Sequence, residues 1–271
     1  MTPLHVSAKR KLLKESENPL LFLPSTNRDI TDTLEYIDAT ADVQSEASGL
    51  PVDAGVTSLR VMSSTGNIRM PVDLSIQTST GLHRGVHMSR LVKAANRRSP
   101  KGMEQWLRLI CSEVNRTQPG SSVTATFELP YDDQFAKVTM RSTARGAVTY
   151  RYVIDGMTAC PCSKKMIGIG HMQRAQMTVV LKSEKALNSL DVVGRIAECF
   201  SASPKEEMKR LEEAKKILEA QANPKFAEDL VRDCVSRFPN ALFVSGRCFE
   251  SIHAHDALAT WSARPGWMPV L

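Results

Sequence analysis

Residues 123–140 read VTATFELPYDDQFAKVTM and carry the clearest strand pattern of the chain. Apolar side chains occupy alternate positions at Val123, Ala125, Phe127 and Leu129, and again at Ala136, Val138 and Met140. A period of two places such side chains on one face of a strand. The turn 131–133, Tyr-Asp-Asp, is rich in residues that favour chain reversal. We therefore predict an antiparallel hairpin with one buried face.

The same order of elements is predicted twice along the chain. The first set comprises strands at 56–62 and 67–78, helices at 86–96 and 101–116, and the hairpin above. The second comprises strands at 147–155 and 173–182, helices near 190–200 and 224–238, and strands at 241–249 and 257–262. An additional helix is predicted at 204–222, with Pro204 in its first turn.

This order predicts an α+β fold of two similar modules, each an antiparallel sheet with helices on one face. We place the first module at 51–146 and the second at 147–271, although no repeat is visible at the level of residues. Residues 1–50 are polar and lack a clear period, which indicates an irregular N-terminal arm.

The composition is that of an ordinary globular protein. The chain has 271 residues, 42% of them hydrophobic, and a formal charge of +6 that is spread along the sequence. Such a balance suits an anionic ligand as well as nucleic acid, and of the two we expect the anionic ligand and no nucleic-acid partner. We also expect no membrane span, because no run reaches roughly 20 apolar residues. We expect a cytoplasmic protein. The six cysteines do not form the pattern of a secreted disulfide framework, so metal binding or catalysis is favoured.

Residues 158–174, TACPCSKKMIGIGHMQR, are the stretch richest in reactive side chains. Cys160, Cys162 and His171 stand in a long connection between two predicted strands, where binding sites are commonly built. Thiolate and imidazole are ligands for Zn²⁺ or Fe²⁺, but the spacing matches no zinc finger or ribbon. The alternative is a pair of partly buried thiols beside an exposed histidine.

Two further places suggest a site. His253 and His255 are separated by one residue, so in a strand both imidazoles project to the same face. The alternative is a polar strand end. Glu198 lies on an otherwise apolar helix, where a carboxylate is costly unless it is paired or binds a metal, or unless the helix boundary gives it access to solvent.

The segment 85–90, GVHMSR, opens a predicted helix. Free backbone N–H groups at a helix N-terminus favour an anion, and His87, Ser89 and Arg90 could add to such a site. A capped helix with exposed cations is the alternative. Lys209 and Glu213 belong to a charged stretch that would ordinarily be a solvated helix face.

Together these segments resemble the type IB GTP cyclohydrolases, from about residue 41 to the C-terminus. The residues that carry the resemblance are DVQ at 42–44, GVHMSR at 85–90, CPCSK at 160–164, GH at 170–171 with QR at 173–174, Glu198 with SAS at 201–203, KR at 209–210 with Glu213, NPKF at 223–226 with ED at 228–229 and VRD at 231–233, and FESIH at 249–253 with HDA at 255–257. The resemblance implies tandem tunnelling-fold (T-fold) modules and a homotetramer.

The resemblance also implies roles for individual residues. The metal positions are matched by Cys160, His171, Glu198 and His253, and the ion is one Fe²⁺, Mn²⁺ or Zn²⁺ per site, which this ligand set does not discriminate. Glu213 matches the acid of the purine pocket, and we add it to the catalytic candidates Cys162, Glu250 and His255. For proton transfer we rank Cys162 first. The candidates for binding the substrate are His87, Ser89, Arg90, Lys164, Arg174, Lys209 and Glu213.

The reaction implied is hydrolytic opening of the imidazole ring of GTP, with release of formate and formation of 7,8-dihydroneopterin triphosphate for tetrahydrofolate or pterin biosynthesis. Alternatives are a cyclohydrolase that gives the 2′,3′-cyclic phosphate or serves a specialised pterin or deazapurine pathway, and a nucleotide-binding homologue without turnover. The chain departs from the family pattern at Leu91, Met172 and Ala254, and its loop between Cys160 and His171 is one residue shorter.

Overall fold

The computed structural model describes residues 43–63, 69–97 and 101–266. The chain divides into two compact units, one made of residues 49–82 and 86–271 and the other of residues 1–48 and 83–85. Within the second of these, the described residues contain the 3-10 helix η2 (Val43–Ser45) and a bridge between Ala47 and His83. Most of the predicted N-terminal arm, residues 1–42, lies outside the described residues. The rest of the fold belongs to the larger unit.

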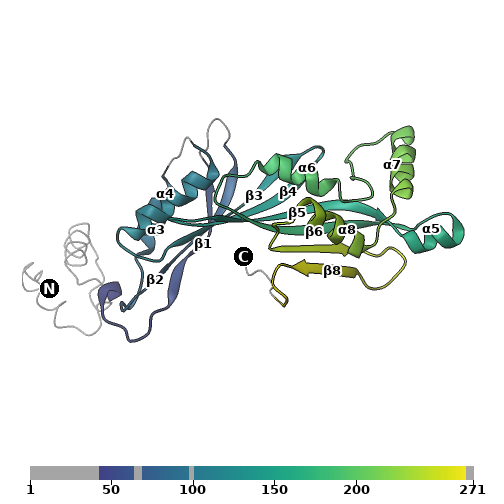
Figure 1. The fold of residues 1–271 in the computed structure, drawn as a ribbon. Coiled ribbons are helices and arrows are strands. Elements are labelled where there is room, and N and C mark those ends of the chain that lie inside the picture. Colours follow the sequence, from purple (N-terminus) through teal and green to yellow (C-terminus); the bar gives the residue numbers. More distant parts are fainter. Residues whose placement is uncertain (1–42, 64–68, 98–100, 267–271) are drawn as a thin grey trace, which may run out of the picture. The chain divides into compact units, whose positions relative to one another are not determined.

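Eight antiparallel strands form one sheet in the order in which they occur along the chain (Figure 1). They are β1 (Asp53–Met62), β2 (Pro71–Ser79), β3 (Ser122–Tyr131), β4 (Gln134–Thr143), β5 (Val148–Ala159), β6 (Met172–Ser183), β7 (Phe243–Cys248) and β8 (Ala257–Ser262). The predicted hairpin is β3 and β4, paired from Ser122 with Thr143 to Tyr131 with Gln134. Every strand is therefore hydrogen-bonded to its neighbour in sequence.

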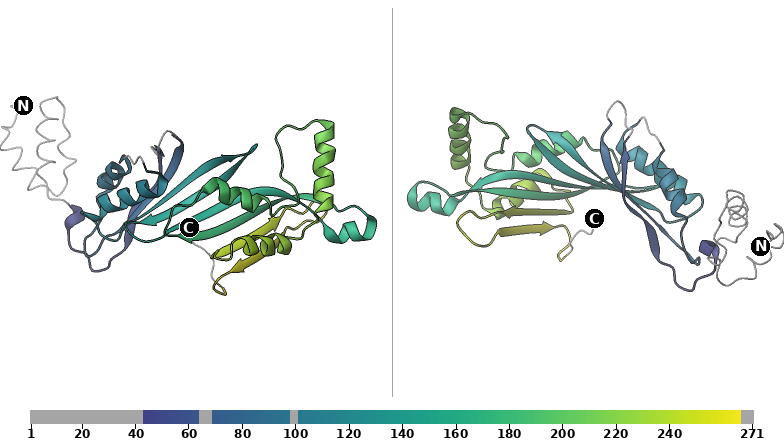
Figure 2. Two further views of the ribbon diagram at one scale, coloured as in Figure 1. Left: turned by 45° about the horizontal axis from the view of Figure 1, so that its top comes forward. Right: turned by 180° about the vertical axis from the view of Figure 1, so that it is seen from behind.

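The helices lie in three of the connections between strands. Helices α3 (Met88–Ala95) and α4 (Met103–Asn115) follow β2, and the short α5 (Pro161–Ile167) caps the β5–β6 hairpin. Helices α6 (Ser189–Ala197), α7 (Arg210–Ala222) and α8 (Ala227–Arg237) follow β6. Figure 2 shows α5 at the far end of the long β5–β6 hairpin in both views. Among the described residues, no helix is long and apolar enough to cross a membrane.

One face of the sheet is covered by helices and holds the core. Strand pairing aligns Ala125 with Met140, Met140 with Tyr150, and Tyr150 with Leu181, and all four side chains are buried. Helix α4 packs on β3 and β4, α6 on β3 and β5, and α8 on β7 and β8. The alternation seen in the sequence thus places the apolar side of each strand beneath the helices, as hydrophobic burial requires.

The predicted order of elements and the α+β class are confirmed. The order strand, strand, helix, helix, strand, strand occurs in the first half, and the second half repeats it with α5 and α7 added. This is the element order expected for tandem T-fold modules. The sheet runs through both halves without a break, and a boundary between residues 146 and 147 stays a prediction.

Two predicted helical details were wrong. Helix α7 begins at Arg210 and not at Pro204, because tertiary contacts hold the preceding segment outside the helix: the Pro204 carbonyl accepts a bond from Gln134 Nε2, and Lys205 pairs with Asp133. Helix α5 was not predicted, although Pro161 in its first turn and a left-handed Gly168 at its end, with φ of 83°, are typical helix boundaries.

The second predicted strand was also too long at its start. Strand β2 begins at Pro71, the first strand position that a proline tolerates well, while residues 69–70 are irregular. Residues 67–68 lie outside the described part of the chain.

Candidate metal centre and its surroundings

The candidate site lies at the end of the β5–β6 hairpin. Beyond the last strand pair, Ala159 with Met172, the Cys160 amide donates to the His171 carbonyl at 2.9 Å and extends the pairing by one step. Gly170 is packed against this step, since a Cβ there would lie 2.5 Å from the Cys160 carbonyl oxygen. The hairpin thus holds the Cys160 and His171 backbones side by side.

The imidazole of His171 is held by polar side chains from strand β6 and from the β7–β8 connection. Its Nδ1 lies 2.9 Å from Gln173 Oε1, 3.4 Å from Ser251 Oγ and 3.8 Å from Glu250 Oε2. Gln173 Nε2 in turn donates to Glu250 Oε1 at 3.4 Å. A chain of contacts therefore runs from imidazole to amide to carboxylate, and it orients both groups that could bind a cation.

His171, Glu250 and His253 form a three-residue cluster whose potential ligand atoms all lie within 4.8 Å of one another. The His171 and Glu250 side chains are only 14% and 13% exposed, whereas His253 is exposed. The His253 ring stands edge-on to His171 at 6.1 Å between centroids and is stacked on His255 at 5.3 Å. We call these three residues the His171 cluster.

Strand pairing brings the two parts of the cluster together. Strand β7 ends at Cys248, opposite Ala175 of β6, and the next amide, Phe249, donates to the Arg174 carbonyl at 2.9 Å. At the other end of the connection, Asp256 accepts bonds from Arg247. The segment 249–256 is therefore fixed at both ends beside the start of β6.

The structure does not bring Glu198 into the His171 cluster. Glu198 is the C-cap residue of α6, its side chain is 63% exposed, and its carboxylate is paired with Arg237 of α8. In this structure the Glu198 carboxylate is therefore stabilised by an ion pair at an exposed helix boundary. The Cys160 backbone is hydrogen-bonded to that of His171, but among the described residues Cys160 is not part of the His171 cluster.

The remaining catalytic candidates, His255, Cys162 and Glu213, lie outside the His171 cluster. His255 is exposed, and its ring is stacked on that of His253, a member of the cluster. Cys162 is exposed in the first turn of α5. Glu213 is exposed near the start of α7, two turns from Gln221, whose amide is hydrogen-bonded to Gly170. Eight residues of helix span about 12 Å, so Glu213 is set back from the hairpin end.

The lysine and arginine candidates for substrate binding either contact other protein groups or are exposed outside the His171 cluster. The Lys164 ammonium donates to the Gln221 backbone carbonyl, and Arg174 pairs with Asp155 at 3.1 Å on the exposed side of the sheet. Lys209 is exposed at the N-cap of α7, where its backbone amide donates to Glu212 at 3.0 Å. None of these ammonium or guanidinium groups is recorded in contact with the His171 cluster.

His87, Ser89 and Arg90 lie at the start of α3, in the first half of the sheet. Helix α3 packs on β1, and four strands separate β1 from β6, which carries the His171 end. At about 4.8 Å per strand, the two places are about 24 Å apart across the sheet. A single copy of the chain therefore does not bring these three residues to the His171 cluster.

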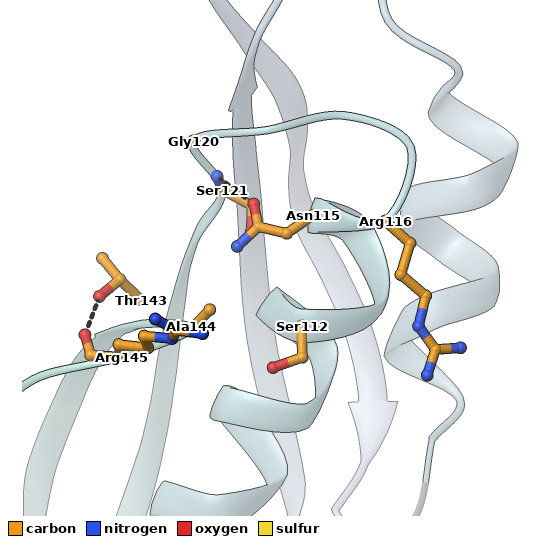
Figure 3. A pocket seen from close by; sticks show the side chains of 8 residues that line it. All are labelled: Ser112, Asn115, Arg116, Gly120, Ser121, Thr143, Ala144 and Arg145. Atoms are coloured by element: carbon orange, nitrogen blue, oxygen red, sulfur yellow. Dashed lines mark hydrogen bonds between the residues drawn. The ribbon is translucent and has the colours of Figure 1, made fainter.

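A pocket of about 620 Å³ also lies in the first half, between the end of α4 and the β4–β5 turn (Figure 3). Its lining residues are Ser112, Asn115, Arg116, Gly120, Ser121, Thr143, Ala144 and Arg145. None of them was a candidate in the sequence, and Arg116 is paired with Glu113. The pocket is thus separate from the site described above.

Comparison with known proteins identifies the family of this chain. The family model described as type I GTP cyclohydrolase FolE2 matches residues 47–259, which include every candidate residue. The chain belongs to this family. A GTP cyclohydrolase FolE2 from Dictyoglomus turgidum is 32% identical over 234 residues, covering 78% of this chain and 89% of that protein. One from Desulfosudis oleivorans is 26% identical over 255 residues, covering 81% and 96%.

A uricase from Arthrobacter globiformis is a far more distant structural neighbour. It has a TM-score of 0.43 and 8% identity over 83% of this chain and 98% of the uricase.

Some residues of the site were missed as functional in the sequence. Gln173 stands two positions after His171, and in an extended segment that spacing puts both side chains on one face, so the signal was present. Gln221 and Ser251 carry no comparable signal, because their contacts to residues 170 and 171 depend on how distant segments meet. Only the folded chain reveals these two.

Proposed function

We propose that this chain is a metal-dependent GTP cyclohydrolase that opens the imidazole ring of GTP, releases formate and forms 7,8-dihydroneopterin triphosphate for pterin and tetrahydrofolate biosynthesis. The observation that carries the proposal is the convergence of His171, Glu250 and His253 at the hairpin end of a FolE2 family chain. Relatives that cover four fifths of the chain bear the name GTP cyclohydrolase.

The donor set of the His171 cluster fits a divalent metal. Two imidazoles and a carboxylate within 4.8 Å suit Fe²⁺, Mn²⁺ or Zn²⁺. We propose His171 and His253 as ligands, with Cys160 as a further ligand because its backbone adjoins that of His171. Since Glu198 is paired with Arg237, we propose Glu250 as the carboxylate of the centre. A divalent ion held there would lower the pKa of a bound water from 15.7 towards about 7.

The neighbouring side chains supply orientation and proton transfer. With its proton on Nδ1, His171 would donate a hydrogen bond to Gln173 Oε1, and the lone pair on Nε2 would be available for the metal. Opening of the purine ring requires a proton at the departing nitrogen. Two exposed groups have suitable chemistry: Cys162, two residues after Cys160, and His255, which is stacked on His253.

We assign recognition of GTP to residues in both halves of the chain. The Glu213 carboxylate can accept hydrogen bonds from guanine N1–H and the 2-amino group together, which adenine does not offer. We propose cationic and polar side chains for the triphosphate: His87, Ser89, Arg90, Lys164, Arg174 and Lys209. Charge-assisted bonds to phosphate are the physical basis of this proposal.

A homotetramer would explain how the first half of the chain contributes. Both edge strands of the sheet, β1 and β8, have one unpaired side within the described chain. Three apolar side chains beside the candidate site are largely exposed: Met166 at 71%, Ile167 at 76% and Ile169 at 66%. Such a group of exposed apolar side chains is typical of a surface that another protein covers. Contact with another copy would cover them, and we propose that a second copy presents its α3 terminus to the site.

The proposal is tested by an anaerobic assay of metal-free protein loaded separately with Fe²⁺, Mn²⁺ or Zn²⁺. We expect formate release from GTP that depends on the metal, and mass spectrometry should identify dihydroneopterin triphosphate. A 2′,3′-cyclic phosphate product would instead select the alternative cyclohydrolase. Tight GTP binding without formate for any metal would refute the proposed reaction and favour a nucleotide-binding role.

A further inference from the structure

Helix α7 is attached to the rest of the chain mainly at its C-terminal end. Its only buried residue is Ala220, which packs with Ala159 and Ala202 in a small separate cluster. The preceding turns are largely exposed, including Leu211 at 85% and Leu218 at 68%. The direction of α7, and with it the place of Glu213, therefore depends on a few contacts at its last turn.

The side-chain amide of Gln221 makes the most specific of these contacts. Its Oε1 accepts a bond from the Gly170 amide at 2.9 Å, and its Nε2 donates to the Gly170 carbonyl at 2.8 Å. One amide thus satisfies both backbone groups of a residue that lies outside the β-ladder. The Gln221 backbone carbonyl in turn accepts a bond from the Lys164 ammonium of α5.

Gly170 transmits this contact directly to the candidate metal centre. It precedes His171 in the chain and packs against the Cys160 backbone, where no Cβ would fit. The His171 amide is fixed separately by Ser163 Oγ at 3.1 Å, and its imidazole by Gln173. A displacement of Gly170 would therefore move the His171 backbone relative to the groups that hold its ring.

We propose that Gln221 is a positioning residue, which holds His171 in place for the metal through Gly170 and couples α7, with Glu213 and Lys209, to that position. This inference rests on the proposed metal centre at His171. The physical reason is that a metal-binding imidazole must be oriented before the ion arrives, and partners outside the ligand set typically contribute 10- to 100-fold to metal affinity. Gln221 meets that description through the backbone.

The test compares Gln221→Met with the control Glu219→Gln in the full-length protein. Methionine keeps the length of the side chain and removes both bonds to Gly170. Glu219 lies on the same helix and pairs with Lys216, and it makes no recorded bond to Gly170. For each protein, metal-free samples are titrated with Co²⁺, the visible absorption of the bound ion is recorded, and thermal unfolding without metal is measured.

We expect the Co²⁺ dissociation constant of Gln221→Met to rise about 10- to 100-fold, with an altered visible spectrum, while Glu219→Gln matches the wild type. At saturating metal, the KM for GTP should also rise, because α7 carries Glu213. Co²⁺ affinity within twofold of the wild type and an unchanged spectrum would overturn the inference. A merely structural role would lower the unfolding temperature and leave the spectrum of the folded fraction as in the wild type, which also overturns it.

Two further proteins separate the outcomes. If Gln221→Met does not fold, Gln221→Glu keeps the acceptor for the Gly170 amide, loses the donor to its carbonyl, and is held to the same Co²⁺ criteria. His171→Ala tests the centre itself: Co²⁺ affinity equal to that of the wild type would refute the metal proposal and this inference together. Loss of Co²⁺ binding in His171→Ala with unchanged binding in both Gln221 variants would refute the inference alone.

Discussion

Replacement of Glu250 by glutamine should weaken metal binding strongly, whereas the same change at Glu198 should not. Glu250 is 13% exposed and lies 3.8 Å from the His171 ring, within a cluster whose ligand atoms are at most 4.8 Å apart. The 4.8 Å between ligand atoms is an upper bound on the distance from the carboxylate to an ion they share. At that distance and an effective dielectric constant of about 20, a carboxylate attracts a unit positive charge by about 3.5 kcal/mol, and a divalent ion by about 7 kcal/mol. Desolvation offsets a large part of this attraction.

We therefore expect Glu250→Gln to cost at least about 2.8 kcal/mol of metal binding, a roughly 100-fold rise in the dissociation constant. Glu198 is 63% exposed and its partner Arg237 is 37% exposed, so Glu198→Gln should change stability by about 0 to 1 kcal/mol and leave metal affinity unaltered. Calorimetric titration of both metal-free variants with Mn²⁺ measures the difference. Metal loss in Glu198→Gln, with retention in Glu250→Gln, would refute this reasoning and restore the ligand set expected from the sequence.

Three other outcomes are expected. In the native protein a thiol reagent at pH 8 should modify the exposed Cys162 quickly, and Cys111 only on unfolding, because burial raises the pKa of Cys111 to about 11. Mass spectrometry of the labelled peptides measures the two rates, and equal labelling of both cysteines would contradict this. Burial also raises the pKa of Tyr152 from 10.0 to about 12, so its neutral form contributes stability below pH 10 that is lost as pH rises through 12. Urea unfolding at pH 9 and pH 11 should show a loss about 1.4 kcal/mol smaller for Tyr152→Phe than for the wild type, and an equal loss would exclude this role. Gly156→Ala places a Cβ 2.1 Å from the Phe200 ring and should cost about 1–3 kcal/mol, so an unchanged melting temperature would show that the ring moves freely.

The fold could be predicted from the sequence because its strands are amphipathic. Residues 123–140 alternate so regularly that the hairpin, its turn and its buried face all follow from a period of two. The start of α7 could not be predicted in this way. Contacts of Pro204 and Lys205 with a distant turn decide it, and local propensity contains no information about such contacts.

The candidate site was predictable in part. The clusters at 160–171 and 248–256 stand out by their composition, and the fold brings them together. Glu198 was matched to the metal by the family resemblance, whereas the apolar helix alone left three alternatives open: an ion pair, a metal, or access to solvent at the helix boundary. In the structure its carboxylate pairs with Arg237 on a different helix, a contact that the sequence does not show.

The geometry of the site depends on strand register more than on any single loop. His171 stands at the start of β6, and Glu250 and His253 follow β7, so the pairing of Ala175 with Cys248 sets their separation. A slip of one residue would move every β7 side chain to the opposite face of the sheet. Val244 and Cys248 are buried on the helix-covered face, and Gly246 packs under α8, where a Cβ would come within 3.1 Å of the Ala227 carbonyl oxygen. The hydrophobic core beneath α8 therefore fixes the register, and through the register it fixes the distance between ligands that lie far apart in the sequence.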